Sequence, residues 1–115
     1  MLRQRHSRRG SRPRAPAHVF AALGDETRLL LVRKLCGGEP RSISQLTRGS
    51  RLTRQAITKH LRVLENAKIV RSVRAGRESR FQFNPQPMEE LKHYLDFVSE
   101  QWDQALARLK AFVEI

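Results

Sequence analysis

The chain has 115 residues, 39% of them hydrophobic, and a formal net charge of +12. This length and composition suit one small domain with a modest core and argue against a second independent domain. So large a surplus of positive charge favours a polyanionic partner, above all nucleic acid, over a small neutral ligand.

The charge is distributed unevenly along the chain. Residues 1–18 contain six arginines and no acidic residue, residues 19–86 contain 14 basic and five acidic residues, and residues 87–115 contain three basic and six acidic ones. An anion-binding surface is therefore expected in the first three quarters. Cys36 is the only cysteine, and no apolar run suits a membrane span or a secretory signal. We expect a cytoplasmic protein without an intrachain disulfide.

Residues 1–16 are rich in Arg, Ser, Pro and Gly and contain almost nothing to bury. Such a segment cannot offset its ordering entropy, so it is expected to be a disordered basic arm. The arm is either a solvated tail or an extension that contacts phosphates or a minor groove. An organellar transit peptide is also Arg-rich, but no amphipathic face forms here.

The pattern becomes helical at Ala17, and this first helix ends before Gly24. Asp25 is a suitable N-cap for a second helix, which ends before Gly37. The apolar residues expected to pack in these two helices are Val19, Phe20, Leu23, Leu29, Leu31, Val32 and Leu35.

A helix-turn-helix pattern follows. Ser44 can cap a short helix that carries Leu46, and Thr53 can cap a second helix after a turn at residues 49–50. One face of this second helix is apolar, with Ile57, Leu61 and Leu64. The other face combines residues that neutralise phosphate with side chains that can hydrogen-bond base edges: Arg54, Gln55, Thr58, Lys59 and Arg62. Thr53, at the start of this helix, is also expected to contact DNA. We interpret the helix as a DNA recognition helix.

The next residues predict a two-stranded β-hairpin, because apolar and polar residues alternate from Ile69 to Arg74 and from Arg80 to Phe83 around a turn at residues 75–78. A hairpin directly after a recognition helix is a wing. Three of its arginines could follow a DNA backbone or minor groove, although simple solvation also explains them: Arg74, Arg77 and Arg80.

Pro85 and Pro87 precede a long helix, which is expected from about Met88 to near the C-terminus. Its apolar residues recur at alternating spacings of three and four, as in a heptad seam: Met88, Leu91, Leu95, Val98, Trp102, Ala105, Leu109 and Phe112. Further apolar residues beside the seam could pack on the helix's own domain: Tyr94, Phe97, Leu106 and Val113. Two apolar stripes exceed the need of one small domain, which favours homodimerisation. The predicted organisation is an arm (1–16), a DNA-binding domain (17–86) and a dimerisation helix (87–115).

The chain contains three segments in the order LGDETRLLLVRKL, SISQL and TRQAITKHLRVLENAKIVRSVRAGRESRFQF. Together, over roughly Phe20 to Asn84, they resemble the ArsR/SmtB family of bacterial winged-helix repressors. The resemblance implies a mainly α-helical winged helix-turn-helix with a small β-hairpin, in the α+β class. It also implies a homodimer that represses by occupying operator DNA at the bacterial nucleoid.

Two departures from the family pattern bear on function. Metal-sensing members carry two cysteines where this chain has Ser42 and Ser44, and hydroxyls are poor ligands for soft metals. The thiol sensor site is therefore missing, and the trailing helix is similar to that of a subgroup which often lacks a metal site. Lys68 stands where many members have glycine after the recognition helix.

Other chemistry is weakly indicated. His93, Asp96 and Glu100 lie on one side of the long helix, but three weak candidate ligands with no second cluster predict a solvated face and no metal. His60 is expected to pack at the domain edge, and Cys36 to be a buried or idle thiol. No catalytic constellation, phosphate-binding glycine loop or cofactor fingerprint occurs, which predicts a protein without enzymatic activity or cofactor.

These patterns predict a homodimeric, sequence-specific repressor of an inverted-repeat operator in double-stranded DNA. Gln55, Thr58 and Arg62 are expected to read bases, while Arg54, Lys59 and the wing arginines hold phosphates. The alternative is a sequence-tolerant nucleic-acid-binding or chromosome-organising protein. A sensor with an organic ligand at the dimer interface is a third possibility, for which the sequence offers no polar pocket.

Overall fold

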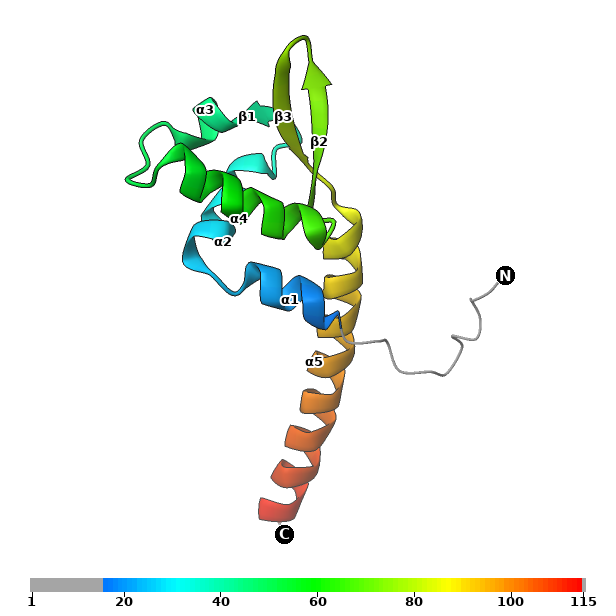
Figure 1. Ribbon diagram of the computed structural model, residues 1–115. Coiled ribbons are helices and arrows are strands. Elements are labelled where there is room, and N and C mark those ends of the chain that lie inside the picture. The colour runs from blue at the N-terminus through cyan, green and yellow to red at the C-terminus, as the bar shows by residue number, and fades with distance from the viewer. Residues whose placement is uncertain (1–15, 115) are drawn as a thin grey trace, which may run out of the picture. The chain divides into compact units, whose positions relative to one another are not determined.

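The computed structural model describes residues 16–114, which form a mainly helical chain with a small antiparallel sheet (Figure 1). The elements follow in the order α1 (Ala17–Leu23), α2 (Glu26–Leu35), β1 (Arg41–Ser42), α3 (Ile43–Thr47), α4 (Arg54–Asn66), β2 (Val70–Ala75), β3 (Glu78–Phe83) and α5 (Gln86–Val113). Residues 17–88 form one compact unit, and α5 from Glu89 onward belongs to a second. The expected basic arm lies outside the described residues, except for Pro16.

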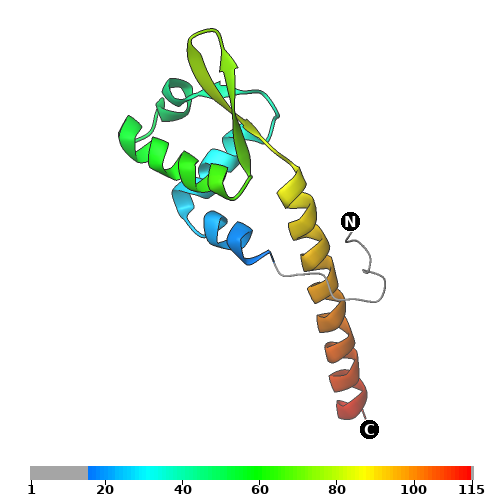
Figure 2. The same cartoon turned by 45° about the vertical axis from the view of Figure 1, so that its right-hand side comes forward.

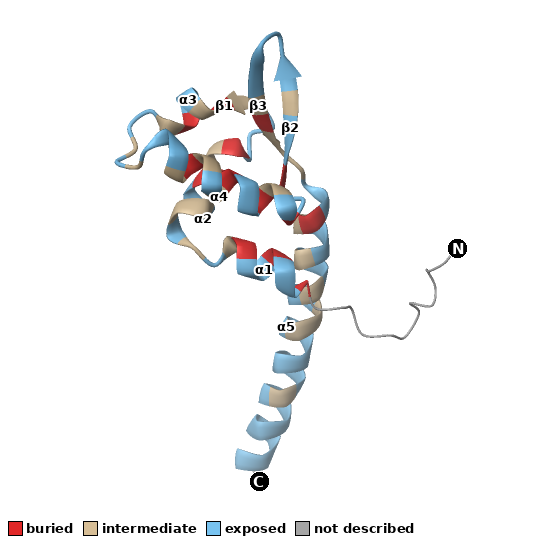
Figure 3. Cartoon of the chain, in the orientation of Figure 1, coloured by how far each residue is buried: buried red, intermediate tan, exposed pale blue. Residues whose placement is uncertain are grey.

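The core of residues 17–88 lies where α1, α2 and α4 meet and at the base of the β2–β3 hairpin (Figure 3). The largest fully buried side chains are Val19, Leu31, Leu35, Leu46, Ile57, Leu61, Leu64, Ile69 and Val70. Burying one such aliphatic side chain stabilises the fold by about 1.5–3 kcal/mol relative to leaving it exposed. The recognition helix is thus held through its apolar face.

Two residues expected in the core lie largely outside it. Leu29 is 48% exposed and Phe20 is 37% exposed. Leu29 and Leu31 are two positions apart, and such side chains point to nearly opposite sides of a helix. Leu31 lies on the buried side of α2, which leaves Leu29 on the exposed side. Leu29 and Leu30 line an apolar pocket of about 610 Å³.

Side-chain caps fix the starts of α2 and α4, as predicted. The Asp25 carboxylate accepts a hydrogen bond of 3.0 Å from the backbone N–H of Arg28. The Thr53 hydroxyl accepts one of 3.1 Å from the backbone N–H of Ala56. Each cap satisfies a donor that has no partner within its helix.

The cap of α3 is Ser42, so the prediction of Ser44 was wrong. The Ser42 hydroxyl accepts from the backbone N–H of Gln45 at 3.1 Å, and the Gln45 side chain accepts from the backbone N–H of Ser42 at 2.8 Å. This reciprocal capping box satisfies two backbone donors at once, whereas Ser44 would satisfy one. Ser44 lies inside the first turn and is free for a different contact.

The wing has three strands, where the sequence predicted two. β2 and β3 pair antiparallel through a two-residue turn at Gly76 and Arg77, and Gly76 has the positive φ of 67° that such a turn requires. β1 adds to the other edge of β3 by pairing Arg41 with Phe81. The hairpin projects away from the helices of its unit (Figure 2).

The recognition helix ends in a Schellman motif with a lysine at the left-handed position. The backbone N–H of Lys68 donates to the Glu65 carbonyl at 2.9 Å, and that of Ile69 donates to the Leu64 carbonyl at 2.9 Å. Lys68 has a φ of 66°, which favours glycine. The Asn84 side-chain amide donates to the Lys68 carbonyl at 2.9 Å. The helix therefore ends sharply despite the residue that replaces glycine.

Helix α5 begins at Gln86, two residues before the expected Met88. Pro87 is accepted in the first turn, where a backbone N–H has no helical partner. Four large side chains of the predicted seam are exposed, namely Leu95, Trp102, Leu109 and Phe112. Leu91, Val98 and Ala105 are half-buried. No helix within the described residues is both long and apolar enough to cross a membrane.

Candidate nucleic-acid interface

Helix α4 has two faces of opposite character. Its apolar face is 0–2% exposed at Ile57, Leu61 and Leu64. The predicted DNA-contacting residues Arg54, Gln55, Lys59 and Arg62 are all exposed, and Thr58 is half-buried. A helix fixed through one face and offering cations and amides on the other has the form that a major groove accepts.

Both predicted threonines already make hydrogen bonds within the helix. Thr53 is occupied as the N-cap. The Thr58 hydroxyl donates to the backbone carbonyl of Arg54 at 2.7 Å. Its oxygen still has a lone pair, and its methyl group remains for apolar contact. Thr58 is therefore presented as an acceptor, whereas Thr53 is first of all a structural residue.

Arg54 is oriented by the preceding helix. Its guanidinium donates to the hydroxyl of Ser44 on α3. This contact gives Ser44 a function that the sequence did not indicate, because it joins the two helices of the helix-turn-helix. Arg54 has further N–H donors beyond that bond, which a phosphate oxygen can accept.

The wing arginines do not share one face. Side chains alternate along a strand, so Ser72 and Arg74 lie on the same face of β2. Ser72 donates to the Glu65 carboxylate on α4 at 2.9 Å, which identifies this as the α4 side of the wing. Arg80 pairs with Val73, one position along, and lies on the opposite face.

Arg77 and Arg74 are exposed, whereas Arg80 is half-buried and its Nε lies 3.0 Å from a Glu78 carboxylate oxygen. An ion pair of this kind offsets the charge that Arg80 could offer to a phosphate. Of the three predicted wing residues, the structure thus brings Arg74 to the α4 side, leaves Arg77 at the tip and separates Arg80 from both.

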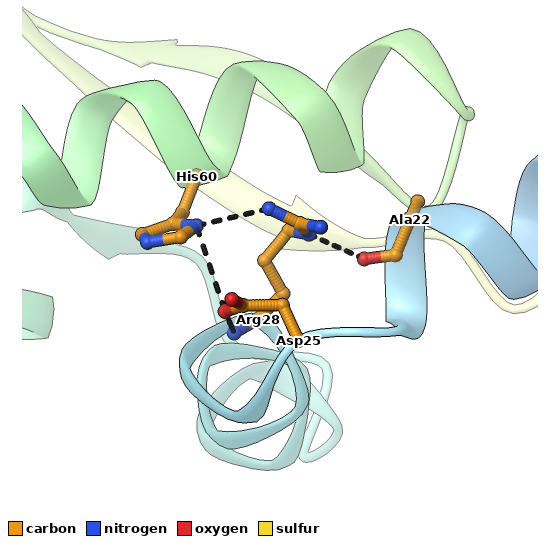
Figure 4. Close-up of polar contacts among 4 residues, drawn as sticks. All are labelled: Ala22, Asp25, Arg28 and His60. Carbon is orange, nitrogen blue, oxygen red and sulfur yellow. Dashed lines mark hydrogen bonds and ion pairs between the residues drawn. The ribbon is translucent and has the colours of Figure 1, made fainter.

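His60 packs against the start of α2, as expected for a residue at the domain edge (Figure 4). Its Nδ1 lies 3.1 Å from a guanidinium nitrogen of Arg28 and 3.7 Å from a carboxylate oxygen of Asp25. Arginine has only donors, so Nδ1 accepts this hydrogen bond only when that nitrogen carries no proton. The Arg28 Nε also donates to the Ala22 carbonyl. These contacts join the recognition helix to the α1–α2 corner.

The Asp25 carboxylate is stabilised in its charged form. The backbone N–H of Arg28 has the largest effect on Asp25 and lowers its pKa. Desolvation comes second and raises the pKa, while the charges of His60 and Arg28 and the backbone N–H of Thr27 have smaller effects that lower it. A lowered pKa stabilises the fold above the ordinary aspartate value, and this stabilisation is lost as the pH falls through the folded-state value. The cap is therefore fully charged near neutral pH.

Two further predictions concern reactive groups. Cys36 is exposed, so it is not a buried thiol. Among residues 16–114, no three His, Cys, Asp or Glu side chains gather as a metal site would require. His93, Asp96 and Glu100 are all exposed on α5.

Helices α3 and α4 with their connecting turn, followed by the β2–β3 hairpin, define a winged helix-turn-helix protein. Residues 25–72 match the family described as bacterial regulatory protein, arsR family. The HTH-type transcriptional regulator Rv2034 of Mycobacterium tuberculosis is 33% identical over 93 residues, which is 81% of this chain and 83% of that protein.

Solved structures agree with the family match. The ArsR-like transcriptional regulator from Rhodococcus sp. RHA1 is 37% identical, with a TM-score of 0.72 over 84% of this chain and 91% of that one. The homodimeric winged helix-turn-helix DNA-binding domain Mb0332 (fragment 1–100) from Mycobacterium bovis has a TM-score of 0.58 at 19% identity, over 74% of this chain and 78% of that one, which shows the fold alone. The chain belongs to the arsR family and is a helix-turn-helix transcriptional regulator. Such regulators are not a class of enzyme.

Proposed function

We propose that this protein is a homodimeric repressor that binds an inverted-repeat operator and acts by occluding the promoter, without catalysis and without a cofactor. The observation that carries the proposal is the two-sided α4, whose apolar face of Ile57, Leu61 and Leu64 is buried while its cations and amides are exposed. Such a protein works in the bacterial cytoplasm, on the nucleoid.

The exposed seam of α5 supports the dimer. Trp102 is 63% exposed and Phe112 is 76% exposed in the single chain. When a second helix covers large apolar side chains at heptad positions, their burial stabilises the association of the two helices. The Mb0332 domain with the same fold is described as homodimeric. A two-fold dimer presents two recognition helices, which successive major grooves accept roughly 34 Å apart.

The α4 geometry supports the following residue roles within each half-site. Gln55 and Arg62 are exposed and have the donors to read base edges, and Thr58 adds an acceptor and a methyl group. Arg54, held by Ser44, and Lys59 hold phosphates, as do Arg74 and Arg77 on the wing. Arg80 contributes less than these two because of its pairing with Glu78.

The decisive experiment selects bound fragments from genomic DNA and compares the affinity for the selected site with that for random DNA at one physiological salt concentration. A specific repressor should bind its site about 10³-fold or more tightly than random sequence. A ratio near one would instead favour the sequence-tolerant, chromosome-organising alternative. Transcription from a promoter carrying the site should fall when the protein is added, and a rise would contradict repression.

A further inference from the structure

A basic pocket is lined by residues that lie outside α4. It has a volume of about 310 Å³ and is lined by Lys34, Arg41, Gln45, Leu46 and Arg48. Three of these side chains are cationic, and none of these described lining residues is acidic. The lining residues come from the last turn of α2, from β1 and from α3 with its C-cap, and each of these elements contacts β3.

One donor in this pocket is buried without a partner. The Nε of Arg41 is inaccessible to solvent and makes no hydrogen bond within the described residues. A buried donor without an acceptor costs about 1–3 kcal/mol, so a rotation of the Arg41 side chain that brings Nε to an acceptor oxygen in the pocket would be stabilising. The rest of the Arg41 guanidinium reaches the surface, where its nearest acid is Glu39 at 3.9 Å.

The charge of the pocket is poorly compensated. Glu39 is 79% exposed at its side chain, and a solvated contact at 3.9 Å neutralises little of the Arg41 charge. The Lys34 ammonium donates to the Leu46 carbonyl at 3.4 Å, which leaves two of its three N–H donors for another acceptor. Arg48 is exposed at the end of α3.

A polar amide completes the set of donors. The capping box uses the Gln45 Oε1, so the amide group of the same side chain is left to donate. Leu46 is 1% exposed and forms the apolar floor. The ligand that fits this arrangement has several acceptor oxygens and at least one negative charge, since guanidinium and ammonium groups both bind such oxygens.

We propose that the Lys34–Arg41–Arg48 pocket binds a phosphate group. Two sources carry this chemistry. A DNA backbone can bring a phosphate to α3, which is joined to the recognition helix through Ser44 and Arg54, and a free phosphate or phosphate ester can enter the same pocket. The DNA source rests on the proposed function, whereas the free source does not.

The test uses the full chain with Arg41→Gln and Lys34→Gln. Arg33→Gln is the matched control. Arg33 is an exposed neighbour of Lys34 on α2 and does not line the pocket, so this substitution removes one positive charge outside the pocket. Calorimetric titration with inorganic phosphate at fixed ionic strength forms one arm. The salt dependence of binding to a DNA duplex forms the other.

A free-phosphate site predicts that both pocket variants bind phosphate about tenfold or more weakly than the parent and Arg33→Gln do. A backbone-phosphate site predicts that each pocket variant makes the negative slope of log affinity against log salt shallower by about 0.9, while Arg33→Gln leaves the slope unchanged. Either result supports the proposal. Unchanged phosphate titrations together with unchanged slopes in both pocket variants would overturn it.

If Arg41→Gln does not fold, Arg41→Lys replaces it in both measurements. Lysine keeps the charge but lacks the Nε donor, so at least part of the loss should remain. The salt slope can be measured on random DNA as well. A protein that fails to discriminate a selected site from random sequence would refute the proposed repressor function, while both arms would still report on the phosphate pocket.

Discussion

The two longest helices that the structure describes, α4 and α5, differ in the burial of their apolar residues. In α4 the residues of the apolar face, Ile57, Leu61 and Leu64, are buried within residues 17–88, and the polar face is exposed to solvent. In α5 four large seam residues, including Trp102 and Phe112, remain exposed. An amphipathic pattern in sequence looks similar in both helices.

The difference lies in where the covering surface comes from. The α4 face is complete within one chain, so its pattern encodes folding and leaves the other face for recognition. The α5 seam is not covered within one chain, and in the proposed dimer its pattern serves assembly. The following changes test this contrast, in order of decreasing expected effect.

Breaking the seam should have the largest effect on DNA binding. Leu95→Glu combined with Trp102→Glu puts two charges into the proposed dimer interface, and separating the two recognition helices removes an avidity of about 10²–10⁴. Sedimentation should show monomers, and gel shifts should show affinity for the selected site reduced by that factor. The control is Gln104→Glu with Ala107→Glu, which adds the same charge at exposed positions outside the seam. A double seam variant that binds with parental affinity would contradict the seam assignment.

Breaking the buried face of α4 should destabilise the fold itself. Leu61 is 0% exposed, so Leu61→Ala should lower the free energy of unfolding by about 2–5 kcal/mol. Val63→Ala is the control on the same helix, since Val63 is an exposed residue and should cost well under half as much. Urea titration followed by circular dichroism measures both. Equal losses would mean that the two faces of α4 do not differ as the structure has them.

Changing the exposed face of α4 should affect recognition without affecting folding. Gln55→Ala and Arg62→Ala should each cost about 1–3 kcal/mol on the selected operator and relax its sequence preference. Lys59→Ala should instead weaken binding to all sequences alike and reduce the salt slope by about one. Quantitative gel shifts on operator and mutated duplexes separate the two patterns. Uniform losses for all three variants would show that α4 contacts only the backbone.

Relieving the end of α4 should have the smallest effect. Lys68→Gly removes the cost of a left-handed lysine but adds unfolded-state entropy, so we expect a net gain of about 0.5–1 kcal/mol in the free energy of unfolding. Lys68→Ala serves as the control, because it removes the same charge and keeps the backbone strain. Thermal unfolding of the two variants should differ by a few degrees. An alanine variant as stable as the glycine variant would exclude backbone strain as the cause.

Much of the fold followed from local sequence signals. The 3.6-residue periodicity located α4, Asp25 and Thr53 matched the caps that the structure shows, and alternation located the hairpin. The cap of α3 also had a local signal, because Ser42 and Gln45 stand three residues apart as a capping box requires. Ser44 has no Gln or Glu three residues further on, so it lacks that spacing.

The remaining features depend on contacts between distant residues. Strand β1 has only two residues, and it exists because Arg41 pairs with Phe81 far along the chain. Two residues cannot show an alternating pattern. The contact of His60 with Arg28 spans 32 positions, and no periodicity predicts it. The sequence therefore supplied the helix faces, while the contacts that orient individual side chains needed the folded chain.

In the proposed interface, the hydrogen bond from the Thr58 hydroxyl to the Arg54 carbonyl restricts which bases Thr58 can contact. With its proton committed to the backbone, Thr58 offers a base pair only an acceptor and a methyl group. Adenine N6 and cytosine N4 can donate to that acceptor, and the thymine methyl can pack on the threonine methyl. Guanine presents only acceptors in the major groove. The strand position that faces Thr58 in each half-site should therefore exclude guanine.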